Sequence, residues 1–269
     1  MNLEGSVAIV TGAGGGIGAA LCRRFVEHGA RVVATDLDER RLKSEVEAIA
    51  ADHPGTIEAL AGDCSDVEHI RATIALAESS FGPVDLYAAN AGVGLGENLD
   101  ATPSDWQTSI DVNVMAHVRA AELLVPGWLE RGSGHFLSTA SAAGLLTQIG
   151  SATYSVTKHA AVAFAEWLSV TYGSRGIGVS CLCPMGVNTA MLNSGADSDS
   201  EAARQGAKAV TQAGLVLEAL EVADIVVASL ATDEFLILPH PDVLEFYRRK
   251  ASDYDRWLRG MRRYQESLA

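Results

Sequence analysis

The hydrophobic and polar positions of the chain fall into two alternating patterns, which together predict strands and helices in regular succession. Short aliphatic runs, typical of strands buried on both faces, are expected at Ser6–Thr11, Arg31–Asp36, Ile57–Ala61, Val84–Ala89, Gly134–Thr139, Gly178–Cys183 and Phe235–Leu238. Stretches with helical spacing lie between them, at Ala19–His28, Glu39–Ala51, Val67–Phe81, Trp106–Leu129, Tyr154–Tyr172 and Ala219–Leu230. Such repeated units predict the α/β class, with a doubly wound parallel sheet of about seven strands and helices on both faces.

Two segments interrupt this succession, although no linker divides the 269 residues into separate domains. Residues 190–214 are small, polar and weakly helical, which suits a flexible lid over a substrate pocket. Residues 239–269 are predicted to form an amphipathic helical extension. Its apolar positions are Val243, Leu244, Tyr247, Tyr254, Trp257, Leu258, Met261 and Tyr264. Because this stripe needs burial, we expect the extension to contact another subunit.

Charge and composition exclude several classes of function. The formal net charge of −14 argues against binding to nucleic acid, which requires clustered Lys and Arg. No apolar run is long enough to span a membrane, and the N-terminus lacks the features of a signal peptide, so we expect a soluble, cytoplasmic protein. Cys181 and Cys183 lack the further ligands of a metal site, so we expect structural thiols and no metal.

A glycine-rich turn, TGAGGGIG at Thr11–Gly18, follows the first strand and opens the first helix. Gly12, Gly16 and Gly18 permit a tight turn, close approach to a pyrophosphate and close packing of helix on strand. Asp36 ends the second strand, where a carboxylate can hold the ribose diol and repel a 2′-phosphate. The pattern therefore predicts NAD rather than NADP as cofactor; a turn without a ligand is the alternative.

Tyr154 and Lys158 lie four residues apart in the predicted helix, so the phenol and the ammonium share one face. The pair YxxxK alone is short enough to arise by chance on any helix surface. Its interpretation therefore depends on the rest of the chain.

Further short motifs occur in a fixed order: TGAGGGIG (11–18), Asp36, GDCSD (62–66), ANAG (89–92), DVNV (111–114), STAS (138–141), YSVTK (154–158) and PMGVNT (184–189). With these motifs the chain resembles the short-chain dehydrogenase/reductase family over residues 4–235. The resemblance implies a Rossmann-like fold, a homo-oligomer (tetramer or dimer) and an NAD-dependent oxidoreductase that interconverts a secondary alcohol and a ketone.

The resemblance also implies a role for each matching residue. Tyr154 would be the general acid/base, and Lys158 would favour the phenolate and bind the nicotinamide ribose. Ser141 would hydrogen-bond the reacting oxygen, and Asn113 would hold a proton-relay water, unless it only bends its helix. The cofactor-binding set is Gly12, Gly14, Gly16, Ile17, Gly18, Asp36, Leu37, Asp63, Cys64, Asn90, Ala91, Gly92, Tyr154, Lys158, Val187 and Thr189.

The predicted substrate-binding residues are Ser141, Gln148, Tyr154, Gly186 and Met191, with Val93, Gly94, Ala143, Ile149 and Leu192 as further pocket candidates. These candidates are mainly apolar and include no Arg or Lys, which favours a neutral, hydrophobic alcohol or ketone. None of the seven histidines is assigned a role.

The chain departs from the family pattern in two places. Met185 stands where the family usually has glycine, and ILPHPDVLEFYRRK replaces the usual segment after the last strand. The second departure suggests a rewired subunit interface, or a tail that covers a neighbour's pocket. Two other functions stay open: an NAD-binding scaffold or regulator without catalysis, and a redox-neutral epimerase or dehydratase.

Overall fold

Seven parallel strands form the central sheet of the computed structural model, which describes residues 1–268. Their order is β3-β2-β1-β4-β5-β6-β9. The strands are β1 (Val7–Thr11), β2 (Arg31–Thr35), β3 (Ile57–Ala59), β4 (Leu86–Ala89), β5 (Gly134–Thr139), β6 (Ile177–Leu182) and β9 (Leu236–Ile237). The predicted α/β class and parallel sheet are confirmed, and the strand bounds differ from the prediction by two residues or fewer.

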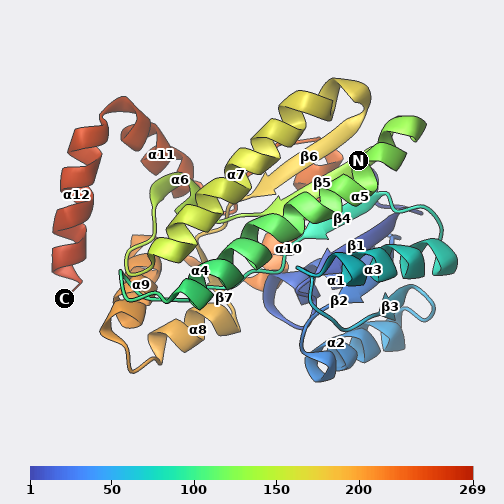
Figure 1. The fold of residues 1–269 in the computed structure, drawn as a ribbon, viewed down its shortest axis with the longest axis horizontal. Helices are drawn as coiled ribbons and strands as arrows, with labels where there is room; N and C mark the ends of the chain where they lie inside the picture. The colour runs from blue at the N-terminus through green and yellow to red at the C-terminus, as the bar shows by residue number, and fades with distance from the viewer. Residues whose placement is uncertain (269) are drawn as a thin grey trace.

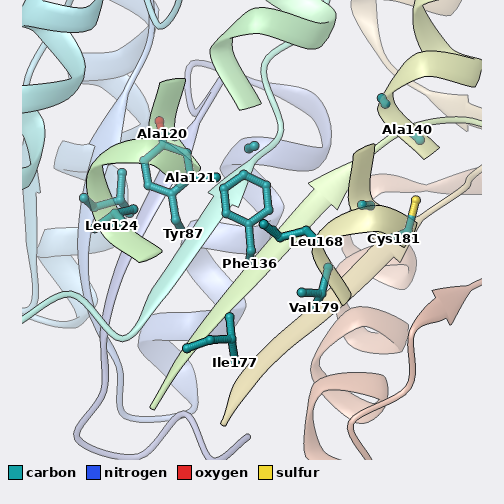
Figure 2. Packing of buried hydrophobic residues seen from close by; sticks show 14 of the residues in the cluster. Tyr87, Ala120, Ala121, Leu124, Phe136, Ala140, Leu168, Ile177, Val179 and Cys181 are labelled. Atoms are coloured by element: carbon teal, nitrogen blue, oxygen red, sulfur yellow. The ribbon is translucent and has the colours of Figure 1, made fainter. Parts of the chain in front are cut away.

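Helices cover both faces of the sheet and enclose two hydrophobic cores (Figure 1). One face carries α3 (Val67–Ser80), α5 (Ala116–Arg131) and α7 (Ala152–Tyr172), and the other carries α1 (Gly16–Glu27), α2 (Glu39–Asp52) and α10 (Ala219–Ala231). In the first core, Phe136 of β5 is fully buried and stacks on Tyr87 of β4 with ring centroids 5.8 Å apart (Figure 2). Burial on both faces explains why the strands are continuous apolar runs.

The long helix predicted from Trp106 to Leu129 is interrupted by a π-helical turn. It consists of α4 (Pro103–Ile110), the turn η1 (Asp111–Met115) and α5. A capping box between Thr102 and Asp105 fixes the start of α4. π-Turns of this kind are rare and occur mostly at functional sites, and this one contains Asn113.

The lid segment and the C-terminal extension are both helical. The segment predicted to be a lid contains α8 (Ala190–Ala196) and α9 (Glu201–Ala213), flanked by a small parallel sheet of β7 (Gly186–Asn188) and β8 (Val216–Glu218). The extension is two helices, α11 (Asp242–Ser252) and α12 (Tyr254–Ser267). Asp253 separates them because its side chain caps α12 by accepting from the Arg256 N–H. Ala269 lies outside the described residues.

No helix within residues 1–268 is both long and apolar enough to cross a bilayer.

Candidate active site

The order in which successive parallel strands are added to the sheet changes direction at β1, which lies between β2 and β4. The loops that follow β1 and β4 meet at this point. β2 and β3 lie on one side of β1, whereas β4, β5 and β6 lie on the other. In the turn after β1, Gly12 has φ +69°, and a Cβ on it would lie 2.9 Å from Cα of Ala91 in the loop after β4. A crevice at this switch point is where parallel α/β sheets bind their ligands.

The glycine turn brings backbone close to backbone, as its sequence predicts. Gly16 has φ +54° and starts α1, which leaves the first N–H groups of that helix free to face an anion. A Cβ on Gly18 would lie 2.0 Å from the carbonyl oxygen of Gly12, so no side chain fits there. The Thr189 methyl packs against Gly16, at 3.0 Å from the position of a Cβ, so the loop after β6 closes over this turn.

Asp36 lies beside the glycine turn and accepts two backbone hydrogen bonds. Its Oδ2 accepts from the Gly14 N–H and its Oδ1 from the Asp38 N–H, both at 2.9 Å. The Gly62 N–H donates to the Asp36 carbonyl oxygen at 2.9 Å, which brings the expected adenine-pocket segment alongside. In that segment Cys64 is half-buried, and burial raises the pKa of its thiol to about 12.

Other residues of the predicted cofactor set occupy the same edge in different ways. Leu37 is largely exposed beside Asp36, and Asp63 holds its own loop by accepting from the Ser65 N–H and hydroxyl at 2.8 Å. Asn90 is structural: its side-chain amide donates to the Thr11 carbonyl oxygen at 3.0 Å and joins the loops after β4 and β1.

Tyr154 and Lys158 share one face of α7, whose start is capped by the Ser151 hydroxyl. Lys158 is buried, its Nζ donates to the Thr139 carbonyl oxygen at 3.0 Å, and Nζ lies 5.6 Å from the centroid of the Tyr154 ring. Burial lowers the pKa of Lys158 to about 8, because it penalises the charged ammonium. Burial raises the pKa of Tyr154, and the neighbouring Ser141 hydroxyl acts in the opposite direction.

Ser141 follows β5 and is buried next to the loop that follows β6. Its Oγ accepts from the Ala143 N–H at 3.1 Å and lies 3.4 Å from the Pro184 carbonyl oxygen. Ser141 and Tyr154 both line the cavity described below, so this hydroxyl can meet an oxygen atom of a ligand beside the phenol. The structure thus brings Ser141, Tyr154 and Lys158 together.

Asn113 is fully buried in the π-turn and ties three segments together. Its Oδ1 accepts from the Val93 N–H at 2.8 Å, and its Nδ2 donates to the Val93 carbonyl at 2.9 Å and to the Thr157 hydroxyl at 3.0 Å. A Cβ on Gly92 would lie 3.2 Å from Asn113 Oδ1 and 3.1 Å from Lys158 Nζ, so these two side chains converge on that glycine. Both amide N–H groups are used by protein acceptors.

A cavity of about 750 Å³ opens beside these residues. Its wall includes Ser141 and Tyr154, together with the predicted pocket residues Gly94, Ala143, Gln148, Ile149, Met191 and Leu192. Val93 and Gly186 are not among the described residues that line it. Gly186 instead pairs with Val216 in the small sheet, and the backbone of Val93 is engaged by Asn113.

The C-terminal extension supplies cavity residues that the sequence did not reveal: Phe246, Arg249, Trp257, Met261 and Tyr264. Helix α12 docks on α9 of its own chain, where the Tyr264 hydroxyl donates to the Ala209 carbonyl oxygen at 2.8 Å (Figure 1). The tail therefore lines the cavity of its own chain. The apolar stripe of residues 239–269 was the feature of the sequence that indicated burial of the extension.

Arg249 corrects the expectation that no basic residue reaches the pocket. It is the one Arg or Lys among the described residues that line the cavity, and Glu97 is the one acidic residue. Its Nε lies 2.8 Å from Glu245 Oε1, and its side chain is 64% exposed. The wall is otherwise largely apolar.

The residues at the edge of the sheet fit a nicotinamide dinucleotide. The glycine turn forms a cradle that Cβ atoms would fill, and the start of α1 faces it. The Asp36 carboxylate lies beside this turn, where it could accept hydrogen bonds from a ribose diol. Within the described residues, the buried hydroxyl of Thr139 has no hydrogen-bond partner, and the carbonyl of Thr139 holds Lys158. An orphaned polar atom at this point is consistent with a bound partner.

The thiols of Cys181 and Cys183 are buried with their Sγ atoms 3.8 Å apart. Among residues 1–268, no three His, Cys, Asp or Glu side chains cluster closely enough to hold a metal ion.

Comparison with known proteins matches residues 6–200 to the family model described as short chain dehydrogenase. The chain belongs to the short-chain dehydrogenase/reductase family. This short-chain dehydrogenase/reductase is 35% identical over 246 residues to the 1-deoxy-11-beta-hydroxypentalenate dehydrogenase of Streptomyces avermitilis, covering 90% of this chain and 87% of the relative. The protein is therefore an oxidoreductase of this family.

Two solved structures resemble this chain over most of its length. A short-chain dehydrogenase/reductase from Burkholderia phymatum in complex with NAD matches with a TM-score of 0.85 and 30% identity, covering 95% of this chain and 96% of that one. L-sorbose reductase from Gluconobacter frateurii, complexed with NADPH and L-sorbose, matches with a TM-score of 0.78 and 26% identity, covering 88% and 97%. Relatives thus differ in the nicotinamide cofactor that they bind.

Proposed function

We propose that the protein is an NAD-dependent dehydrogenase/ketoreductase that interconverts a hydrophobic secondary alcohol and its ketone. The observation that carries this proposal is the convergence of Ser141, Tyr154 and Lys158 between a largely apolar cavity and the glycine turn. The cofactor, when bound, supplies the acceptor or donor of the hydride.

In this proposal Tyr154 moves the proton of the reacting oxygen. The Ser141 hydroxyl lies on the same cavity wall as the phenol and would orient the substrate oxygen beside it. Lys158 carries a positive charge next to the ring, which favours the phenolate, and its Nζ has N–H donors beyond the one given to Thr139. Asn113 fixes the backbone at Val93 with its side chain, so a relay water would be held by its backbone rather than by its amide N–H groups.

The preference for NAD rests on Asp36. Its carboxylate is oriented by the N–H groups of Gly14 and Asp38, and it would accept from the ribose hydroxyls and repel a 2′-phosphate. Leu37 follows it and brings no compensating positive charge.

The substrate class follows from the cavity. Aliphatic residues of the predicted lid and the aromatic residues of the C-terminal extension contribute to the largely apolar wall of a cavity of about 750 Å³, which suits a bulky, alicyclic or aromatic alcohol. The relative from Streptomyces avermitilis acts on a hydroxypentalenate, and we propose a substrate of comparable bulk here.

We also propose that the protein is a homo-oligomer. Helix α7 presents Val156, Trp167 and Val170 to solvent, with 53%, 52% and 84% of their surfaces exposed. Apolar side chains gathered on one helix are typical of a subunit contact.

The test is the absorbance of NADH when the protein is mixed with NAD and a panel of bulky secondary alcohols, with Tyr154→Phe as the matched variant. We expect NADH to form with the native protein and to be lost in the variant, while both bind NADH equally. Binding of NADH with neither net NADH formation on any alcohol nor net NADH consumption on any of the corresponding ketones would overturn the proposal in favour of a redox-neutral reaction or a scaffold.

A further inference from the structure

His240, at the start of the C-terminal extension, is buried with 3% of its surface exposed. Its Nδ1 accepts a hydrogen bond from the Met185 N–H at 3.1 Å, and its Nε2 lies 2.9 Å from the Gly186 carbonyl oxygen. Because the N–H can only donate and the carbonyl can only accept, the imidazole is neutral and carries its proton on Nε2. A single ring therefore satisfies two backbone groups of the loop after β6.

This loop contacts the segment that carries Ser141 and itself carries the residues expected at the nicotinamide. Upstream, the Pro184 carbonyl accepts from the Ala142 N–H at 2.8 Å, next to Ser141. Downstream, Val187 follows Gly186 directly, and the Thr189 methyl packs against the glycine turn. The backbone between these two anchor points is held by His240.

The extension that carries His240 is itself firmly attached. Val243, in the first turn of α11, is fully buried in the core on the α7 face of the sheet. At the other end of α11, Lys250 is buried and its Nζ donates to the carbonyl oxygen of Leu145 in α6 (Ala143–Leu146), the short helix that follows Ser141. Docking of the extension and the geometry of the active-site loop are therefore mechanically connected.

We propose that His240 is a positioning residue for cofactor binding. It holds the Met185–Gly186 backbone so that Val187 and Thr189 stand against the glycine turn in the arrangement that receives the nicotinamide end of the cofactor. His240 is not among the described residues that line the cavity, so it acts through the backbone. The proposal rests on the proposed function in one respect, that the cofactor binds at the glycine turn.

Three substitutions separate the two hydrogen bonds. His240→Asn keeps an acceptor near the position of Nδ1, His240→Gln keeps a donor near that of Nε2, and His240→Ala keeps neither. A buried hydrogen bond contributes about 0.5–1.5 kcal/mol, a factor of roughly 2–10 in an equilibrium constant. We expect His240→Ala to raise the Kd for NADH about tenfold and the Asn and Gln variants to raise it less.

Two measurements test the proposal: NADH titration followed by its fluorescence, and amide hydrogen exchange of residues 185–189 in the cofactor-free protein. We expect faster exchange at the Met185 amide in His240→Ala and His240→Gln, and retained protection in His240→Asn. His135→Gln is the control, because His135 is a buried histidine near the opposite end of β5, where its Nε2 bonds the Ser180 hydroxyl at 3.0 Å. It should leave both measurements unchanged.

The proposal is overturned if His240→Ala binds NADH within twofold of the native protein with unchanged exchange, or if His135→Gln weakens NADH binding equally. Should the Ala variant not fold, the near-isosteric Asn and Gln variants decide by the same criteria. If the native protein binds no NADH, the proposed function fails, whereas the exchange of residues 185–189 still shows whether His240 holds the loop.

Discussion

Replacement of Asp36 by Asn is predicted to move the cofactor preference of this enzyme toward NADP. The substitution removes one negative charge beside the expected ribose and keeps the size of the side chain. At a separation of about 4 Å, one pair of unit charges interacts by about 1 kcal/mol in water and about 4 kcal/mol at the effective dielectric of a protein surface. Asp36 is half-buried, so its repulsion of a 2′-phosphate should lie between these limits.

The expected shift in the ratio of the Kd values for NADPH and NADH is therefore roughly 5- to 1000-fold, since each 1.4 kcal/mol is a factor of ten. The Asn side chain also turns one N–H donor toward the backbone N–H of Gly14 or Asp38, which weakens the turn. This loss affects both cofactors and cancels in the ratio.

The assay is fluorescence titration with NADH and NADPH at one ionic strength. Asp38→Asn is the matched control, because it removes the same charge two residues away and Asn still caps α2 in place of Asp38. A ratio that stays within twofold in Asp36→Asn, or that shifts equally in Asp38→Asn, would refute the assignment of Asp36 as the residue that selects NAD.

Three further predictions concern the turn, the cavity and the sheet. Gly18→Ala should abolish NADH binding, because its Cβ would meet the Gly12 carbonyl oxygen at 2.0 Å; titration that shows native affinity would contradict this contact. Arg249→Gln should change kcat/KM for neutral alcohols by less than twofold, because the guanidinium is paired with Glu245 and mostly exposed; a tenfold loss confined to carboxylate-bearing alcohols would instead show that it binds substrate charge. Burial lowers the pKa of His135 to about 4, so the unfolded chain binds more protons between pH 6.5 and 4 and stability falls as the pH falls through this window. Urea unfolding at pH 7.5 and 5 should show a loss about 2 kcal/mol larger in the native protein than in His135→Gln, and equal losses would disprove the buried neutral state.

The sequence could predict those parts of the site that depend on local geometry. Tyr154 and Lys158 needed only the helical period to share a face, and Gly18 needed only its place between a strand and a helix. The parallel sheet followed from apolar runs that alternate with helices. These features are encoded within a few residues of one another.

Features that depend on distant contacts could not be predicted. The cavity wall formed by Trp257 and Tyr264 requires α12 to dock on α9, and no periodicity specifies that partner. The π-turn that buries Asn113 has the sequence DVNVM, in which no residue type distinguishes it from an α-helical turn. His240 gave no signal of its own, although it lies in the segment where the chain departs from the family pattern, and its two backbone partners are 54 and 55 residues away.

The most direct test of the central claim is the transfer of the carbinol hydrogen from substrate to cofactor. An alcohol that forms NADH in the panel is prepared with deuterium on its carbinol carbon, and the NADH is analysed by mass spectrometry, with Tyr154→Phe in parallel. Our account predicts one deuterium in each NADH formed by the native protein and NADH formation at least about a hundredfold slower in the variant. NADH without deuterium, or equal rates in the two proteins, would contradict it.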